Sequence, residues 1–151
     1  MRSLNRTILR IFILVAPVFF AFHADAQCKR FTKKNCLPAL APYIHNGKLT
    51  SAVFNPGESA DVEMTFNAGK QYRVLVCSQE TVGNVQFKVL DKTRKILFES
   101  KEDQMNPSWD FKMATTQQLI IQVSIPQMEE SVQKTNLVQN GCVAIMVGVK
   151  N

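Results

Sequence analysis

Short stretches in which apolar and polar side chains alternate dominate the chain from residue 49 onward. Such alternation has the period of a half-buried β-strand, because successive side chains of a strand point to opposite faces of its sheet. Turn residues separate the stretches at regular spacing, which is typical of an antiparallel β-sandwich or barrel. The predicted strands are residues 50–54, 60–66, 71–78, 85–91, 95–100, 109–113, 118–125 and 141–150. We therefore predict an all-β, jelly-roll-like antiparallel β-sandwich of about eight strands in residues 49–151.

Two of these stretches, residues 71–78 and 141–150, are apolar on both faces, so we expect them to be central strands. In most of the others only one face is apolar, and the aromatic side chains fall mainly on that face. Trp109 has the same parity as Phe111 and Met113 and is predicted to belong to the core. Because sugar-binding sites use exposed rings as platforms, this placement only weakly supports an aromatic carbohydrate platform.

Residues 1–26 have the pattern of a secretory signal peptide. Three arginines precede a twelve-residue apolar run, and Ala24-Asp25-Ala26 follows as an A-x-A cleavage site. We predict cleavage after Ala26, so that Gln27 begins the mature chain. A lipid-modified cysteine has to be the first mature residue, which makes lipidation of Cys28 unexpected. The protein is therefore predicted to be secreted or periplasmic, with no transmembrane segment after cleavage.

All four cysteines follow the predicted cleavage site, and an even number in an exported protein indicates disulfides. Four cysteines allow three pairings. We favour Cys28–Cys36, which closes a short loop, and Cys77–Cys142, which joins a central strand to the last strand.

A zinc site would need closely spaced ligands, and the sequence has no C-x₂₋₄-C pair and only one histidine after residue 26. No metal or cofactor is predicted.

The basic character of the predicted mature chain belongs to an N-terminal arm, residues 27–48, which also holds a short helix or turn within 36–45. After residue 26 the chain has 15 basic and 11 acidic residues, a net charge of +4, and residues 27–57 contain no acid. The arm's cations that are candidates for binding are Lys29, Arg30, Lys33 and Lys34. They are suited to lipopolysaccharide, anionic lipid or an acidic protein, and the alternative is a solvated arm pinned by a disulfide. They are too few to predict nucleic-acid recognition.

Residues suited to catalysis are scarce. His45 is the only histidine after residue 26, so any Ser-His-Asp or Cys-His arrangement has to use it, and no G-x-S-x-G motif is present. The adjacent acids Glu102-Asp103 and Glu129-Glu130 fall in predicted polar loops, and no calcium-loop pattern accompanies them. We predict that the protein is not an enzyme, with a hydrolase that uses His45 as a further alternative.

Five segments taken together resemble a family of small exported proteins of unknown function from Bacteroidota-type bacteria: CLPALAPYIHNGK (36–48), FNAGKQYRVLVCS (66–78), VQFKVLDKTRKILF (85–98), WDFKMATTQQLIIQV (109–123) and GCVAIMVGVK (141–150). The F-x-A-G-K-x-Y-x-V run, residues 66–74, with a later strand that ends at Asp91, is also similar to the bacterial pre-peptidase C-terminal domain. That resemblance implies a jelly-roll-like accessory domain without catalytic activity, and it supplies no catalytic residue.

The sequence thus predicts a secreted, non-catalytic binding or structural module of the cell envelope. Its partner is expected to be an envelope protein or a glycan, and a carbohydrate- or lipopolysaccharide-binding module is the first alternative. Because a β-sandwich uses its strands for the core and its loops for contacts, we expect binding at the basic arm, at residues 101–108 or at residues 127–140.

Overall fold

The computed structural model describes residues 23–100, 107–127 and 140–150, and the statements below refer to those residues. Most of the predicted signal peptide lies outside them, and His23–Ala26 are the first residues of a helix. Residues 101–106 and 128–139, which make up most of the two loops predicted as contact regions, also lie outside the described residues. Among the described residues, no helix has the length and apolar character needed to cross a membrane.

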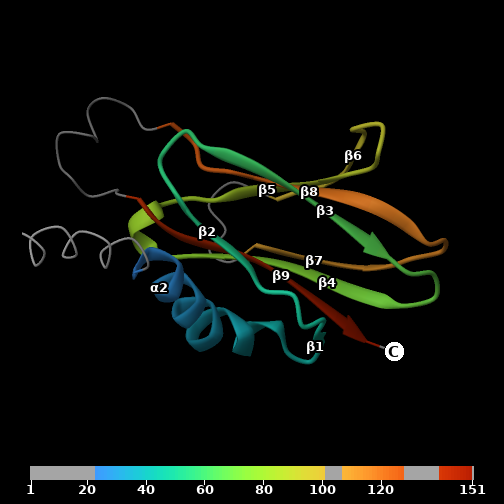
Figure 1. Cartoon of the computed structure of the whole chain (residues 1–151). Coiled ribbons are helices and arrows are strands. Elements are labelled where there is room, and N and C mark those ends of the chain that lie inside the picture. Colours follow the sequence, from blue (N-terminus) through green and yellow to red (C-terminus); the bar gives the residue numbers. More distant parts are fainter. Residues whose placement is uncertain (1–22, 101–106, 128–139, 151) are drawn as a thin grey trace, which may run out of the picture.

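Nine strands of the described chain form two antiparallel sheets that pack face to face (Figure 1). In the first sheet β9 (Gly141–Lys150) lies between β4 (Gln71–Ser78) on one side and both β1 (Ile44–His45) and β2 (Thr50–Phe54) on the other, and β7 (Ser108–Lys112) follows β4. In the second sheet the order is β3 (Ser59–Phe66), β8 (Gln117–Ser124), β5 (Gln86–Leu90) and β6 (Ile96–Glu99). Strands β2 to β9 have the order of a jelly roll, so the predicted fold class is confirmed.

Helix α2 (His23–Phe31), the π-helical turn Thr32–Cys36 and strand β1 were not predicted from the sequence, which indicated only a short helix or turn within residues 36–45. The helix or turn predicted for residues 36–45 is present only as a 3₁₀ turn, Leu37–Leu40, with Pro38 in its first turn. Ile44 and His45 then pair with Val149 and Gly148 of β9. Two residues are too few to show an alternating pattern, so only their pairing identifies them as a strand.

The main core lies between the sheets and contains the side chains predicted to face inward. Phe66 of β3, Phe87 of β5 and Ile121 of β8 are fully buried there against Val74 and Val147 of the first sheet. Trp109 and Phe111 are partly buried and pack against the same cluster. Strands β4 and β9 occupy the centre of the first sheet, as their two apolar faces predict.

The second apolar face of β4 and β9 is covered by the N-terminal arm. Helix α2 (His23–Phe31), one turn of π-helix (Thr32–Cys36) and the 3₁₀ turn lie against the outside of the first sheet (Figure 1). Cys28, Thr32 and Cys36 are buried at intervals of four residues, which places them on one side of the helical segment. A second apolar cluster forms beneath the arm, from Cys36, Leu40, Leu75, Cys77, Ala144 and Met146. The arm is thus a third layer of the fold.

A glycine in β9 permits the close approach of the arm. A Cβ atom at Gly148 would lie 2.5 Å from Cβ of Tyr43 and 3.0 Å from Cγ of Leu40. Real Cβ atoms do not approach other carbon atoms so closely, because van der Waals repulsion rises steeply below the contact distance of about 3.5 Å. Only a residue without a side chain lets the arm pack at this distance.

All four cysteines form disulfides, but the favoured pairing is wrong. The bonds are Cys28–Cys142 and Cys36–Cys77, with Cα separations of 5.3 and 5.8 Å. Cys28 and Cys36 lie eight residues apart along a helical segment, about 12 Å at ideal rise, which no disulfide spans. Cys77 pairs in register with Ala144, so Cys142 is its diagonal neighbour, and such neighbours are about 7–8 Å apart. Each bond therefore joins the arm to the sheet.

Candidate functional site

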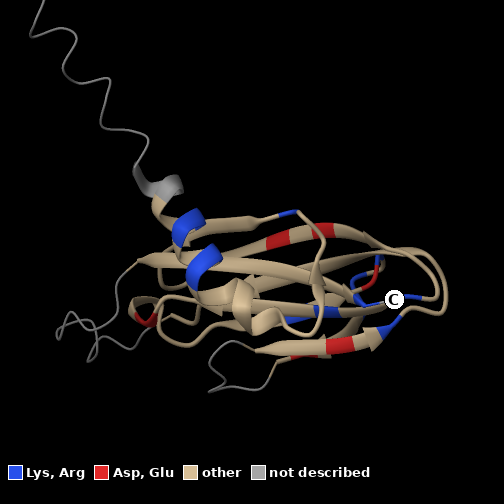
Figure 2. Ribbon diagram, turned by 90° about the horizontal axis from the view of Figure 1, so that it is seen from below, with Lys and Arg blue, Asp and Glu red and all other residues tan. Residues whose placement is uncertain are grey.

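Four cations form the exposed side of the helical arm. Lys29, Arg30, Lys33 and Lys34 are all exposed, whereas Cys28 and Thr32 between them are buried. We call these four residues the cationic face. Figure 2 shows the blue of Lys and Arg on the described part of the helical arm. None of the four forms an ion pair with a described residue. Like charges four residues apart on a helix repel one another, so this arrangement costs the protein some stability.

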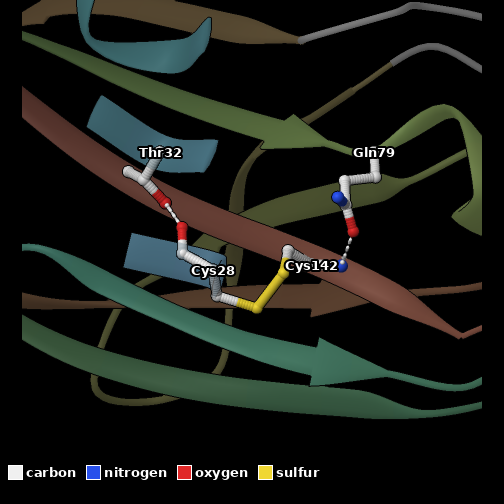
Figure 3. The surroundings of a disulfide bond; sticks show 4 residues. All are labelled: Cys28, Thr32, Gln79 and Cys142. Atoms are coloured by element: carbon white, nitrogen blue, oxygen red, sulfur yellow. Dashed lines mark hydrogen bonds between the residues drawn. A yellow bond between two sulfur atoms is a disulfide. The ribbon is translucent and has the colours of Figure 1, made fainter. Parts of the chain in front are cut away.

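Covalent bonds hold the cationic face in place. Cys28 precedes the four cations and Cys36 follows them, and each is joined to a central strand of the sheet. Oγ1 of Thr32 donates a 2.8 Å hydrogen bond to the carbonyl oxygen of Cys28, and the backbone N–H of Cys142 donates one of 2.8 Å to Oε1 of Gln79 (Figure 3). The backbone that carries the four charges therefore has a fixed position on the sandwich.

A recess of about 580 Å³ opens beside the cationic face. The arm supplies Phe31, Lys34 and Asn35 to its lining, and the end of β4 with the turn that follows supplies residues 77–81. That turn, Glu80–Val82, is a single 3₁₀ turn. The Cys36–Cys77 disulfide joins the arm to the end of β4 beside the recess, and Cys77 is one of the lining residues. Lys34 belongs both to the recess and to the cationic face.

The far end of the arm is held by an ion pair. Nε and Nη2 of Arg73 each donate a 2.7 Å hydrogen bond to one carboxylate oxygen of Asp110, and Nη1 donates to the carbonyl oxygen of Ala41 at 2.8 Å. The guanidinium lies 4.6 Å from the ring centre of Tyr43, whose hydroxyl donates to Asp110 at 3.2 Å. A bidentate guanidinium–carboxylate pair is among the stronger side-chain contacts, and here it joins β4, β7 and the arm.

Hydrogen bonding from Arg73 holds the pKa of Asp110 below its ordinary value of 3.8, against the opposing effect of desolvation. The hydroxyl of Tyr43 has a raised pKa, first because of desolvation and then because of the negative charge of Asp110. Both shifts favour the observed state, in which Asp110 is ionised and Tyr43 is neutral.

We expect the contribution of Asp110 to stability to depend on pH. A depressed folded-state pKa stabilises the protein above the unfolded-state pKa near 3.8, and that stabilisation is lost as the pH falls through the folded-state pKa. Asp110→Asn should therefore lower the free energy of unfolding by about 0.5–1 kcal/mol at pH 7, as for other partly exposed ion pairs. Chemical denaturation at pH 7 and at pH 2 should show the difference shrinking at the lower pH. An equal difference at both pH values would show that the ionised pair contributes nothing.

The aromatic row that includes Trp109 does not form a sugar platform. The ring of Trp109 stacks with two neighbouring rings. Its centroid is 4.2 Å from that of Phe111 and 5.1 Å from that of Phe98. Tyr72 and Phe66 continue this row of ring contacts beyond Phe111. Because neighbouring rings cover Trp109, a sugar has no free ring face on which to stack there.

His45 lies away from any acid–base partner in the described chain. Its Nδ1 accepts a hydrogen bond of 3.2 Å from the backbone N–H of Gly47, and its buried Nε2 has no partner among the described residues. The acids Glu102-Asp103 and Glu129-Glu130 lie outside the described residues. Within the part of the chain that the structure describes, no three His, Cys, Asp or Glu side chains are grouped as metal ligands.

The sequence identified the cationic face but missed the recess and the Arg73–Asp110 pair. The turn 79–82 has no pattern that distinguishes it from other loops. Arg73 and Asp110 are 37 positions apart, and only the β4–β7 register brings them together. Their one sequence signal is that each is a charged residue with an apolar or aromatic neighbour on both sides.

Comparisons with known proteins concern the fold. No protein-family model and no curated protein matches the chain, so the resemblance to a Bacteroidota-type family stays a prediction. The solved structures to which it is similar include PliG of Aeromonas hydrophila, a periplasmic inhibitor of g-type lysozyme, at 14% identity over 72% of this chain and 89% of that one, with a TM-score of 0.49. They also include the pre-peptidase C-terminal domain of a Bacillus anthracis collagenase, at 8% identity over 65% of this chain and 87% of that one, with a TM-score of 0.41. At these values the likenesses carry no argument about function.

Proposed function

We propose that the protein is a non-catalytic, extracytoplasmic binding module of the cell envelope that holds an anionic partner on its cationic face. The observation that carries the proposal is the fixed position of Lys29, Arg30, Lys33 and Lys34. Solubility alone does not require four positive charges to be clustered on a segment that has a disulfide at each end. Four cations that form no ion pair with a described residue create a positive potential that attracts phosphate or carboxylate groups and speeds their association.

Two further observations support the remaining parts of this proposal. Two disulfides fit a protein that folds in an oxidising compartment outside the cytoplasm. The non-catalytic part of the proposal is supported by His45. Apart from His23 it is the only histidine among the described residues, and it has no carboxylate or hydroxyl partner there. We also propose cleavage after Ala26. Measuring the intact mass of the exported protein tests this directly, and the expected mass is that of a chain beginning at Gln27.

Neutralising the cationic face should weaken anion binding strongly. We expect the variant K29Q/R30Q/K33Q/K34Q to bind polyphosphate and polyglutamate about 10- to 100-fold more weakly than the wild type, because each exposed ion pair contributes about 0.2–1 kcal/mol. The wild-type affinity should fall as salt is added, since exposed charges are screened. Fluorescence titration of each labelled polyanion at two salt concentrations measures both effects.

A charge-matched variant separates this site from the effect of net charge. K70Q/K92Q/K112Q/K150Q removes the same number of positive charges from exposed positions outside the arm. We expect it to retain most of the wild-type affinity. Equal losses in the two variants would show that only the overall charge matters, and this would overturn the assignment of the site.

A further inference from the structure

The recess beside the cationic face is lined mainly by polar side chains. The side chains of Asn35, Ser78 and Thr81 hydrogen-bond to no described residue, so their amide and hydroxyl groups are available to a ligand. Glu80 adds a carboxylate that forms no ion pair with a described residue, and Phe31 adds a partly buried ring. A volume of about 580 Å³ is within the usual range for small-ligand sites.

The combination of charges decides between two kinds of anionic ligand. A chain of carboxylates, such as an acidic peptide, is attracted to the cationic face but repelled by Glu80 inside the recess. A sugar presents neutral hydroxyl groups, which donate to the carboxylate of Glu80 and exchange hydrogen bonds with Asn35, Ser78 and Thr81. The apolar C–H face of a sugar ring also suits Phe31.

We propose that the recess binds an acidic saccharide, with neutral hydroxyl groups in the recess and the acidic substituent on the cationic face at Lys34 and its neighbours. This inference rests on the proposed function, and it adds the ligand class and the contact residues. The acidic substituent is a carboxylate or a phosphate, since both accept hydrogen bonds from ammonium groups. The four-carbon stem of Lys34 lets its charge reach a substituent at the mouth of the recess.

Calorimetric titration of the purified, oxidised protein tests the inference with four probes. They are trigalacturonic acid, a neutral trisaccharide of galactose, mannose 6-phosphate and an end-capped triglutamate peptide with the same charge as trigalacturonic acid. We expect trigalacturonic acid to bind at least about tenfold more tightly than either the neutral trisaccharide or triglutamate, because only it uses both parts of the site. Binding of mannose 6-phosphate distinguishes phosphate from carboxylate as the preferred substituent.

Glu80→Gln should affect the two charged trimers in opposite ways. It should weaken the binding of trigalacturonic acid about tenfold, because hydrogen bonds to a charged acceptor are lost. The affinity for triglutamate should stay unchanged or increase. Glu63→Gln, which removes one negative charge from the other sheet, is the matched control and should change neither. Amide NMR shifts at residues 78–81 on addition of trigalacturonic acid to the wild type give a second readout that needs no variant.

The outcomes separate the two proposals. If triglutamate binds as tightly as trigalacturonic acid, or if Glu80→Gln changes both equally, the saccharide recess is wrong while the cationic face stands. Tight binding of the neutral trisaccharide also overturns the requirement for an acidic substituent. If no anionic probe binds the wild type, then the proposed function itself fails.

Discussion

Replacing Cys28 and Cys142 together by alanine should lower the free energy of unfolding by about 5 kcal/mol. The bond closes a loop of 114 residues, and a cross-link across so long a loop removes much conformational entropy from the unfolded chain. A domain of this size has about 5–15 kcal/mol of stability, so the loss is a large share of the total. Denaturant unfolding with linear extrapolation to water measures it.

The same variant should also free the helical arm. Helix α2 has nine residues, of which only Gln27 to Phe31 follow the proposed cleavage site, and isolated helices this short are not stable in water. Trypsin cleaves after lysine and arginine, so cleavage within residues 29–34 should become fast and be visible by mass spectrometry. The cationic face would lose its fixed position, and polyanion binding should weaken even though all four charges remain.

The second disulfide provides the matched comparison. Cys36 and Cys77 are 41 positions apart. By the same loop-entropy reasoning, replacing both by alanine should lower the free energy of unfolding by about 4 kcal/mol. This variant should widen the recess without detaching α2, because Cys28–Cys142 still holds the helix. Equal resistance of both variants and the wild type to trypsin would contradict the view that the bonds fix the arm.

Replacing Phe66 by alanine should destabilise the sandwich by about 3–5 kcal/mol, the usual cost of truncating a buried phenylalanine. The side chain is 1% exposed. It meets Tyr72 edge-on, with centroids 4.9 Å apart, and Phe111 at 5.3 Å. The truncation leaves a cavity and removes both ring contacts, which contribute beyond the buried area. Thermal and chemical unfolding should both report the loss.

Ile44→Ala is the control for this prediction. Ile44 also lies in a strand, but it is 73% exposed, so its truncation should change the stability by less than about 0.5 kcal/mol. A comparable loss in the two variants would mean that the core between the sheets does not dominate the stability. Because Phe66 is remote from the arm in the described contacts, Phe66→Ala should leave polyanion affinity unchanged at temperatures where it is folded.

The alternating pattern predicted the positions of the strands because burial between two sheets places every second side chain in the core. It also identified β4 and β9 as central, since both of their faces had to be covered. What covered the second face was not visible in the sequence. The arm was predicted as a basic segment with a short helix or turn, and its three buried positions Cys28, Thr32 and Cys36 are too few to form a recognisable apolar pattern.

The sequence by itself determined the fold class, the inward faces of the strands and the cationic character of residues 29–34, because these depend on the order of residue types along a short segment. Only the tertiary structure decided the disulfide pairing, the recess at residues 31–35 and 77–81, and the Arg73–Asp110 pair. These depend on which distant segments become neighbours, and that follows from strand order and register in the sandwich and from the packing of the arm across its outer face.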